Sequence, residues 1–144
     1  MNKRSKKLIL SEFMQKVWNE GDFSSLARLV APRYHVSKDA YDPWSDQVIG
    51  HETFKKRVLY SRDAFPDLNF DIREMIEEND RVAVNWVMSG THLGDLALLP
   101  ATGRKFSIEG MRFYAFKNVR LCGHTQSFDQ VGFLKQMGIF GPPA

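Results

Sequence analysis

The spacing of apolar residues changes once along this chain, at Pro66, and that change constrains the fold more than any other feature. Before Pro66, apolar residues recur at helical spacing, as in Ile9, Phe13 and Val17. After Pro66 they alternate with polar residues, as in residues 68–76, which is the period of a half-buried strand. Because helices come first and strands follow, the sequence predicts an α+β fold with an antiparallel sheet.

The helical part is divided by residues that end or begin helices. Gly21 is expected to end the first helix in a left-handed cap, and Asp22 to cap a second one that stops at Pro32. A third helix is predicted over residues 52–64, since the residue before Pro66 avoids the helical region.

The strands are long for so small a protein, which implies a strongly twisted and curved sheet. Wrapped around helices, such a sheet is expected to form a conical barrel with an internal pocket. The strands are predicted at residues 34–37, 68–76, 81–88, 106–116 and 120–128, with loops at 38–49 and 94–103. The 144 residues are expected to form one domain, with residues 1–7 as a flexible basic tail.

Composition excludes several classes of protein. The single Cys122 allows no internal disulfide, and four histidines without convergent spacing predict no metal site. No apolar run is long enough for a membrane span or a signal peptide, so a cytoplasmic protein without a membrane partner is expected. The basic residues near the N-terminus are more simply a solvated end than a nucleic-acid contact, and no nucleic-acid partner is predicted.

Residues 123–138 read as a strand that turns into a short helix, and with other segments they resemble a known family. The ordered segments are Trp18-Asn19-Glu20-Gly21-Asp22, Ala64-Phe65-Pro66-Asp67-Leu68, Asp80-Arg81-Val82-Ala83, Gly90-Thr91-His92-Leu93-Gly94, Pro100-Ala101-Thr102-Gly103-Arg104, Asp129-Gln130-Val131-Gly132 and Gln136-Met137-Gly138. Together they resemble the SnoaL-like polyketide cyclases, which have the cystatin-like or nuclear transport factor 2-like fold.

The resemblance implies a reaction that needs neither metal nor cofactor. In the aromatic-polyketide cyclases, an aspartate on the last strand acts as acid and base in an intramolecular aldol closure. That aspartate falls on Gln126 here, a companion histidine on Arg112 and an asparagine on Val36, while a second histidine is retained as His124. An amide cannot take up a proton at neutral pH, so we expect no substantial cyclase activity on anthracycline-type precursors.

Three polar residues are the candidate catalytic group. His124 and Gln126 share one face of the last strand, and Arg112 is expected to be their neighbour on the adjacent strand. His124 is the candidate acid and base, Arg112 the candidate anion stabiliser, and Gln126 the third polar group. The alternative is a polar patch on the sheet in which Arg112 forms an ion pair.

A further set of side chains is predicted to bind a small hydrophobic carbonyl compound, because aromatic residues suit a pocket wall, Tyr and Trp best of all since their polar atoms need partners when buried. These are Trp18, Tyr34, Tyr60, Trp86, His92 and Phe113. His92 could instead be a turn histidine bonded to backbone carbonyls. Asp129, just before an apolar helical run, is expected to cap that helix rather than to catalyse.

Three functions remain open at this point. The first is a cofactor-free enzyme of the cyclase, isomerase or lyase type. The second is a non-catalytic protein that binds a small molecule in the same pocket, and the third is an interaction module that uses the outer sheet face. A homodimer formed through that face is predicted in each case.

Overall fold

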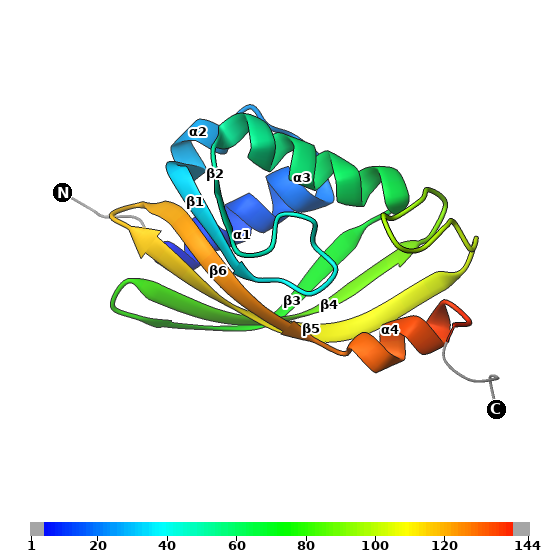
Figure 1. Ribbon diagram of the computed structural model, residues 1–144. Helices are drawn as coiled ribbons and strands as arrows, with labels where there is room; N and C mark the ends of the chain where they lie inside the picture. The colour runs from blue at the N-terminus through cyan, green and yellow to red at the C-terminus, as the bar shows by residue number, and fades with distance from the viewer. Residues whose placement is uncertain (1–4, 140–144) are drawn as a thin grey trace.

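A computed structural model of the chain describes residues 5–139 and has an α+β architecture, in which helices lie against one face of a curled sheet (Figure 1). The helices are α1 (Lys6–Phe13), η1 (Met14–Asn19), α2 (Leu26–Leu29), α3 (His51–Ala64) and α4 (Gln130–Gln136). The strands are β1 (Val30–Lys38), β2 (Gln47–Ile49), β3 (Asn69–Glu78), β4 (Arg81–Thr91), β5 (Lys105–Lys117) and β6 (Arg120–Phe128).

The six strands are arranged in the order β2-β1-β6-β5-β4-β3. Strands β3 to β6 form an antiparallel meander, as the alternating pattern predicts, whereas β1 runs parallel to β6. The predicted fold class is therefore confirmed, with one qualification. The sheet is curled but not closed into a barrel, because β2 and β3 are its two edges and do not pair.

The concave face of the sheet and the helices enclose the core. Along β5, every second residue from Phe106 to Phe116 is buried, and the residues between them are largely exposed. The buried side chains pack against α1, η1 and α3, including Phe13, Trp18 and Phe54. This strict alternation decides which side chains of the sheet can reach an internal site.

The first helix consists of two consecutive elements, the α-helix α1 and the π-helical turn η1. α1 continues directly into η1, which ends at Asn19. Gly21, two residues further on, has a positive φ of 67°, as its predicted left-handed cap requires. Arg62 from α3 donates to the carbonyl oxygens of Trp18 and Asn19 at 2.8 Å each. These bonds satisfy the end of the helix and fix Trp18 over the sheet.

Two N-terminal predictions are wrong. The second helix is a single turn, and Pro32 lies inside β1 rather than ending a helix. Pro32 is tolerated there because it falls in an irregularity of the β1–β6 ladder, between Val30 and His35. Residues 47–49, expected in a loop, pair with β1 as the short strand β2.

The prediction of a flexible tail over residues 1–7 is wrong for residues 5–7. Residues 1–4 lie outside the described residues, but Ser5 caps α1 and Lys6 and Lys7 belong to that helix. Within residues 5–139, no helix is long and apolar enough to cross a membrane.

Candidate functional site

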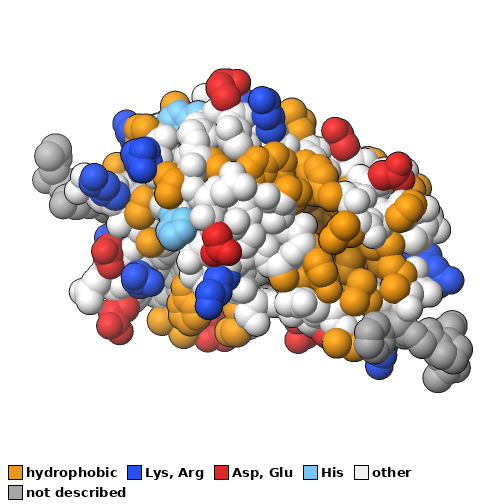
Figure 2. Space-filling view, viewed as in Figure 1, with side chains coloured by type: hydrophobic (Ala, Val, Ile, Leu, Met, Phe, Trp, Pro, Cys, Tyr) orange, Lys and Arg blue, Asp and Glu red, His pale blue; other side chains and the backbone are white. Residues whose placement is uncertain are grey.

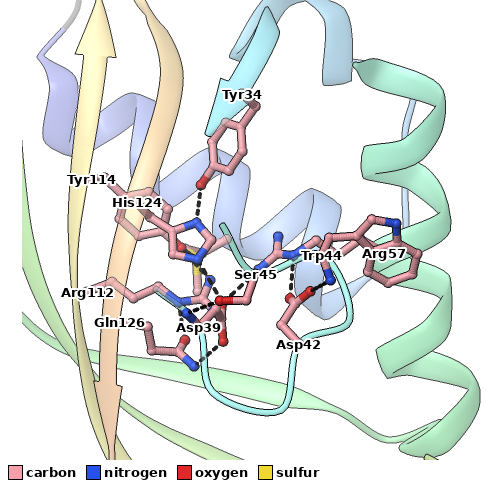
Figure 3. Close-up of polar contacts among 11 residues, drawn as sticks. Tyr34, Asp39, Asp42, Trp44, Ser45, Arg57, Arg112, Tyr114, His124 and Gln126 are labelled. Atoms are coloured by element: carbon pink, nitrogen blue, oxygen red, sulfur yellow. Dashed lines mark hydrogen bonds and ion pairs between the residues drawn. The ribbon is translucent and has the colours of Figure 1, made fainter. Parts of the chain in front are cut away.

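The candidate site is centred on Asp39, which directly follows β1 and is 5% exposed. Its Oδ2 accepts from His124 Nε2 at 2.7 Å and from Arg57 Nη2 at 3.0 Å. Its Oδ1 accepts from Gln126 Nε2 at 2.7 Å. Figure 3 shows these side chains converging from β6, α3 and the end of β1. A buried carboxylate at the end of β1 is thus held by donors from two other elements, β6 and α3.

Arg112 and Gln126 are cross-strand partners on β5 and β6, as predicted. Arg112 Nε donates to Gln126 Oε1, while Arg112 Nη2 reaches Asp39 Oδ2 at 3.4 Å. Gln126 therefore accepts from a guanidinium and donates to a carboxylate, which fixes the orientation of its amide.

His124 is held between Asp39 and Tyr34. The Tyr34 hydroxyl lies 2.5 Å from His124 Nδ1, and both rings are buried. Burial and the nearby Arg112 guanidinium lower the pKa of His124 to about 3, so the ring is neutral at physiological pH. A carboxylate can only accept, so Nε2 carries the proton and Nδ1 accepts from Tyr34.

The charges at the site balance in pairs. Arg57 also donates from Nε to Asp42 Oδ2 at 2.6 Å, so α3 is tied to the loop between β1 and β2 by two carboxylates. Burial raises the pKa of Asp39, but Arg112, His124 and Arg57 together outweigh it and lower that pKa to about 2. Asp39 is therefore ionised at neutral pH despite its burial.

A cavity of about 100 Å³ opens beside this network. Its polar wall includes Asp39, Asp42, Arg57, Arg112 and Gln126, and its apolar wall is largely aromatic. Three buried donors of cavity-lining residues have no hydrogen-bond partner among the described residues: Trp18 Nε1, Trp86 Nε1 and Arg57 Nη1. Unpaired donors on the residues of a cavity wall suit a ligand that carries acceptor oxygens.

The predicted catalytic residues meet, but they do not all reach the cavity. Arg112 and Gln126 line it, while His124 is not among the lining residues and contacts Asp39 from behind. Of the predicted binding residues, Trp18, Tyr60 and Trp86 line the cavity, and Tyr34 lies beyond His124.

The other two predicted binding residues lie away from the cavity. Phe113 is 55% exposed on the outer face of the sheet, because its neighbours Arg112 and Tyr114 occupy the inner positions of β5. His92 is buried, with its Nδ1 bonded to Thr102 and its ring against Phe65. His92 is therefore bonded within its loop, as the alternative predicts, but its backbone partner is the N–H of Thr102 rather than a carbonyl oxygen.

Sequence reasoning missed Asp39 and Arg57. Strand parity from Tyr34 and Val36 would turn Asp39 outward, but the β1–β6 register shifts between Val36 and Lys38 and reverses that parity. No sequence signal for this irregularity was available. For Arg57, its position three residues after Phe54 and four before Ser61, on the helix face predicted to point inward, was a weak indication of burial.

Asp129 has the predicted structural role. Its side chain accepts from the backbone N–H of Gly132 at 2.9 Å and caps α4. It contributes no atom to the cavity beside Asp39.

Known proteins resemble this chain over nearly its whole length. It is 25% identical over 126 residues to the aklanonic acid methyl ester cyclase DnrD of Streptomyces peucetius, covering 87% of this chain and 86% of that protein. A candidate polyketide cyclase from Acidithiobacillus ferrooxidans has a solved structure that is 35% identical, with a TM-score of 0.84, covering 98% of this chain and 100% of its own.

A SnoaL-like polyketide cyclase from Agrobacterium tumefaciens shares the fold at 19% identity, with a TM-score of 0.76 over 94% of this chain and 100% of its own. The model of the SnoaL-like polyketide cyclases matches residues 8–137. The chain therefore belongs to the SnoaL-like polyketide cyclase family.

Proposed function

We propose that the protein is a cofactor-free acid–base enzyme of the cyclase, isomerase or lyase type that acts on a small carbonyl compound, with Asp39 as the proton-transfer group. One observation carries this proposal. The carboxylate of Asp39 lies 2.7 Å from the amide of Gln126. Gln126 stands at the position where the resemblance to the cyclases places their catalytic aspartate. The carboxylate missing from β6 is thus supplied by the end of β1, at the same cavity.

The chemistry requires a base beside an acidic C–H bond. Asp39 would take a proton from the carbon next to the carbonyl, and the electron pair of that bond would form an enolate. The enolate carbon would then attack a second carbonyl, which forms a C–C bond, and Asp39 would return its proton to the new alkoxide oxygen. In an isomerisation, the proton would return to a different carbon.

The donors of the wall would stabilise the developing oxyanion. Arg112 lines the cavity, and Arg57 Nη1 is a buried cationic donor without a partner in the described part of the chain. An enolate that takes a guanidinium donor from Asp39 also removes a contact that lowers the pKa of Asp39. The basicity of Asp39 would therefore rise as negative charge moves onto the substrate.

His124 acts in this proposal by positioning Asp39 rather than by transferring the proton. His124 does not line the cavity, whereas Asp39 does, and both ring nitrogens of His124 are already bonded. The His124 N–H and the Tyr34 hydroxyl keep the Asp39 carboxylate aimed at the cavity.

Deuterium exchange tests the proposal without knowledge of the natural substrate. Small ketones such as 2-butanone and cyclopentanone are incubated with the protein in D2O near neutral pH, and loss of the α-proton signals is followed by NMR. Exchange should fall at least about 100-fold in Asp39→Asn, the lower range for removal of a general base. Asp46→Asn is the matched control, since Asp46 is exposed in the same loop. Equal exchange in Asp39→Asn and wild type would refute the assignment.

A binding protein without catalysis is the second candidate, because every carboxylate oxygen of Asp39 already accepts a hydrogen bond. Ketone binding without any catalysed exchange would favour it. The homodimer, the single domain and the cytoplasmic location stay predictions from the sequence.

A further inference from the structure

We infer that the site takes a two-part ligand: an oxygen-bearing head in the cavity beside Asp39, and an uncharged aliphatic tail in a second, outer hollow. This inference rests on the proposed function for the placement of the head. It adds the substrate class, namely carbonyl compounds with a straight or branched hydrocarbon chain.

The outer hollow has a volume of about 340 Å³ and is formed by the loop after β1, the loop after β4, and α4 with Ile139. Figure 2 shows hydrophobic side chains gathered around this part of the surface. Leu98 is 91% exposed at its rim, and Ile139 is half exposed. Covering an apolar concavity and the exposed leucine at its edge with hydrocarbon lowers the free energy of the complex, because apolar surface is removed from water.

The hollow lies beside the inner cavity. Both are lined by the same six residues: Tyr41, Asp42, Pro43, Tyr60, Leu96 and Phe133. The inner cavity alone is too small for a drug-sized molecule, whose pockets measure about 300 Å³ or more. A ligand with its carbonyl at Asp39 must therefore be small or extend outward past these shared residues.

Tyr60 holds both loops that form the hollow. Its hydroxyl accepts from the backbone N–H of Ala97 at 2.7 Å, and its ring packs edge-on against Trp44 at 5.7 Å between centroids. The backbone groups of Leu96 and Leu99 bond to each other, which turns Leu98 outward. The hollow is preformed, so a tail entering it loses little free energy to the ordering of loops.

The chemistry of the wall selects the tail. Aliphatic side chains dominate it, from Leu96, Leu98, Leu99, Leu134 and Ile139. Asp42 is the one charged residue among the described residues of the lining, and Arg57 already neutralises it. A charged or strongly polar tail would find no partner there, whereas each methylene would bury apolar surface.

A homologous series of ketones measures the tail directly. Binding of 2-butanone through 2-nonanone is followed by the fluorescence of Trp18 and Trp86, which line the cavity. The dissociation constant should fall about fourfold for each added methylene, equivalent to about 0.8 kcal/mol, until the hollow is full. Alkylammonium ions of equal length should bind at least tenfold more weakly, because buried arginine donors oppose a cationic head. A flat series, or equal binding of the ammonium ions, would overturn the inference.

Two variants locate the tail. Leu98→Ser should weaken binding of 2-nonanone at least threefold and leave 2-butanone unchanged. Val119→Ser, which removes a half-exposed apolar side chain from the β5–β6 turn, should change neither. A steep series that Leu98→Ser does not affect would place the tail elsewhere and overturn the inference.

Binding and exchange fail separately in these experiments. A steep binding series without catalysed exchange would refute the proposed enzyme and leave the two-part site standing. Catalysed exchange with a flat binding series would support the proposed enzyme and refute the two-part site.

Discussion

At the scale of single residues, the site depends on charges that are buried together. Asp39 is stabilised by donors that would be costly to leave unpaired, and His124 must stay neutral to fit between Asp39 and Tyr34. Such a network is sensitive to any proton that enters it.

Acid stability tests this network. His124 has a folded-state pKa of about 3, below the ordinary value of 6.5, so the unfolded chain binds the extra proton between these values. The free energy of unfolding should therefore fall as the pH drops below about 6.5, by up to about 1.4 kcal/mol per pH unit for this one group. Asp39, with a pKa lowered to about 2, adds a loss of stability below pH 4.

Urea unfolding at several pH values provides the measurement. His124→Gln should flatten the slope between pH 6 and pH 4, and the exposed His35→Gln should leave it unchanged. His92, whose pKa is also lowered by burial, would retain part of the slope. The same slope in wild type and His124→Gln would contradict the neutral, buried state of His124.

At the scale of elements, regular periodicity was predictable and its interruptions were not. The alternation of β5 and β6 correctly paired Arg112 with Gln126, because side chains of a regular strand alternate without exception. The shift between Val36 and Lys38 in β1 turned Asp39 inward, and nothing in the local residue types marks such an irregularity. The catalytic candidates on regular strands were therefore found, and the carboxylate beyond the irregular one was missed.

The cap of α4 gives a prediction at this scale. Asp129→Asn should keep the stability of the protein, since asparagine caps a helix as well as aspartate does, whereas Asp129→Ala should cost about 1 kcal/mol. Thermal or urea unfolding measures both, and ketone binding should survive both changes. A loss of α-proton exchange in Asp129→Asn, with the fold intact, would instead make Asp129 part of the chemistry.

At the scale of the whole molecule, the outer face of the sheet exposes apolar side chains. Ile76, Ala83 and Phe113 lie in register on β3, β4 and β5, and Ile76 and Phe113 are more than half exposed. Met111 is exposed on the same strand face. The apolar character of this face was predictable from the alternating residues of the strands. Its partner was not predictable in the same way, because a partner is a second chain.

We predict a homodimer through this face, because a contiguous apolar surface is stabilised by a partner. Light scattering at micromolar concentration should give twice the chain mass of 16.6 kDa, and Phe113→Asp should give the monomer. Leu98→Ser, at the other exposed apolar patch, should remain dimeric. A wild-type protein of monomer mass would reject the prediction.

The central claim is that Asp39 supplies the carboxylate that β6 lacks, and moving that carboxylate back tests it most directly. Asp39→Asn combined with Gln126→Glu keeps the charge of the site and exchanges the two neighbouring groups, which are 2.7 Å apart. In the ketone exchange assay, the double variant should exchange α-protons at least tenfold faster than Asp39→Asn alone. Exchange in the double variant no faster than in Asp39→Asn, with both proteins folded by circular dichroism, would contradict the account.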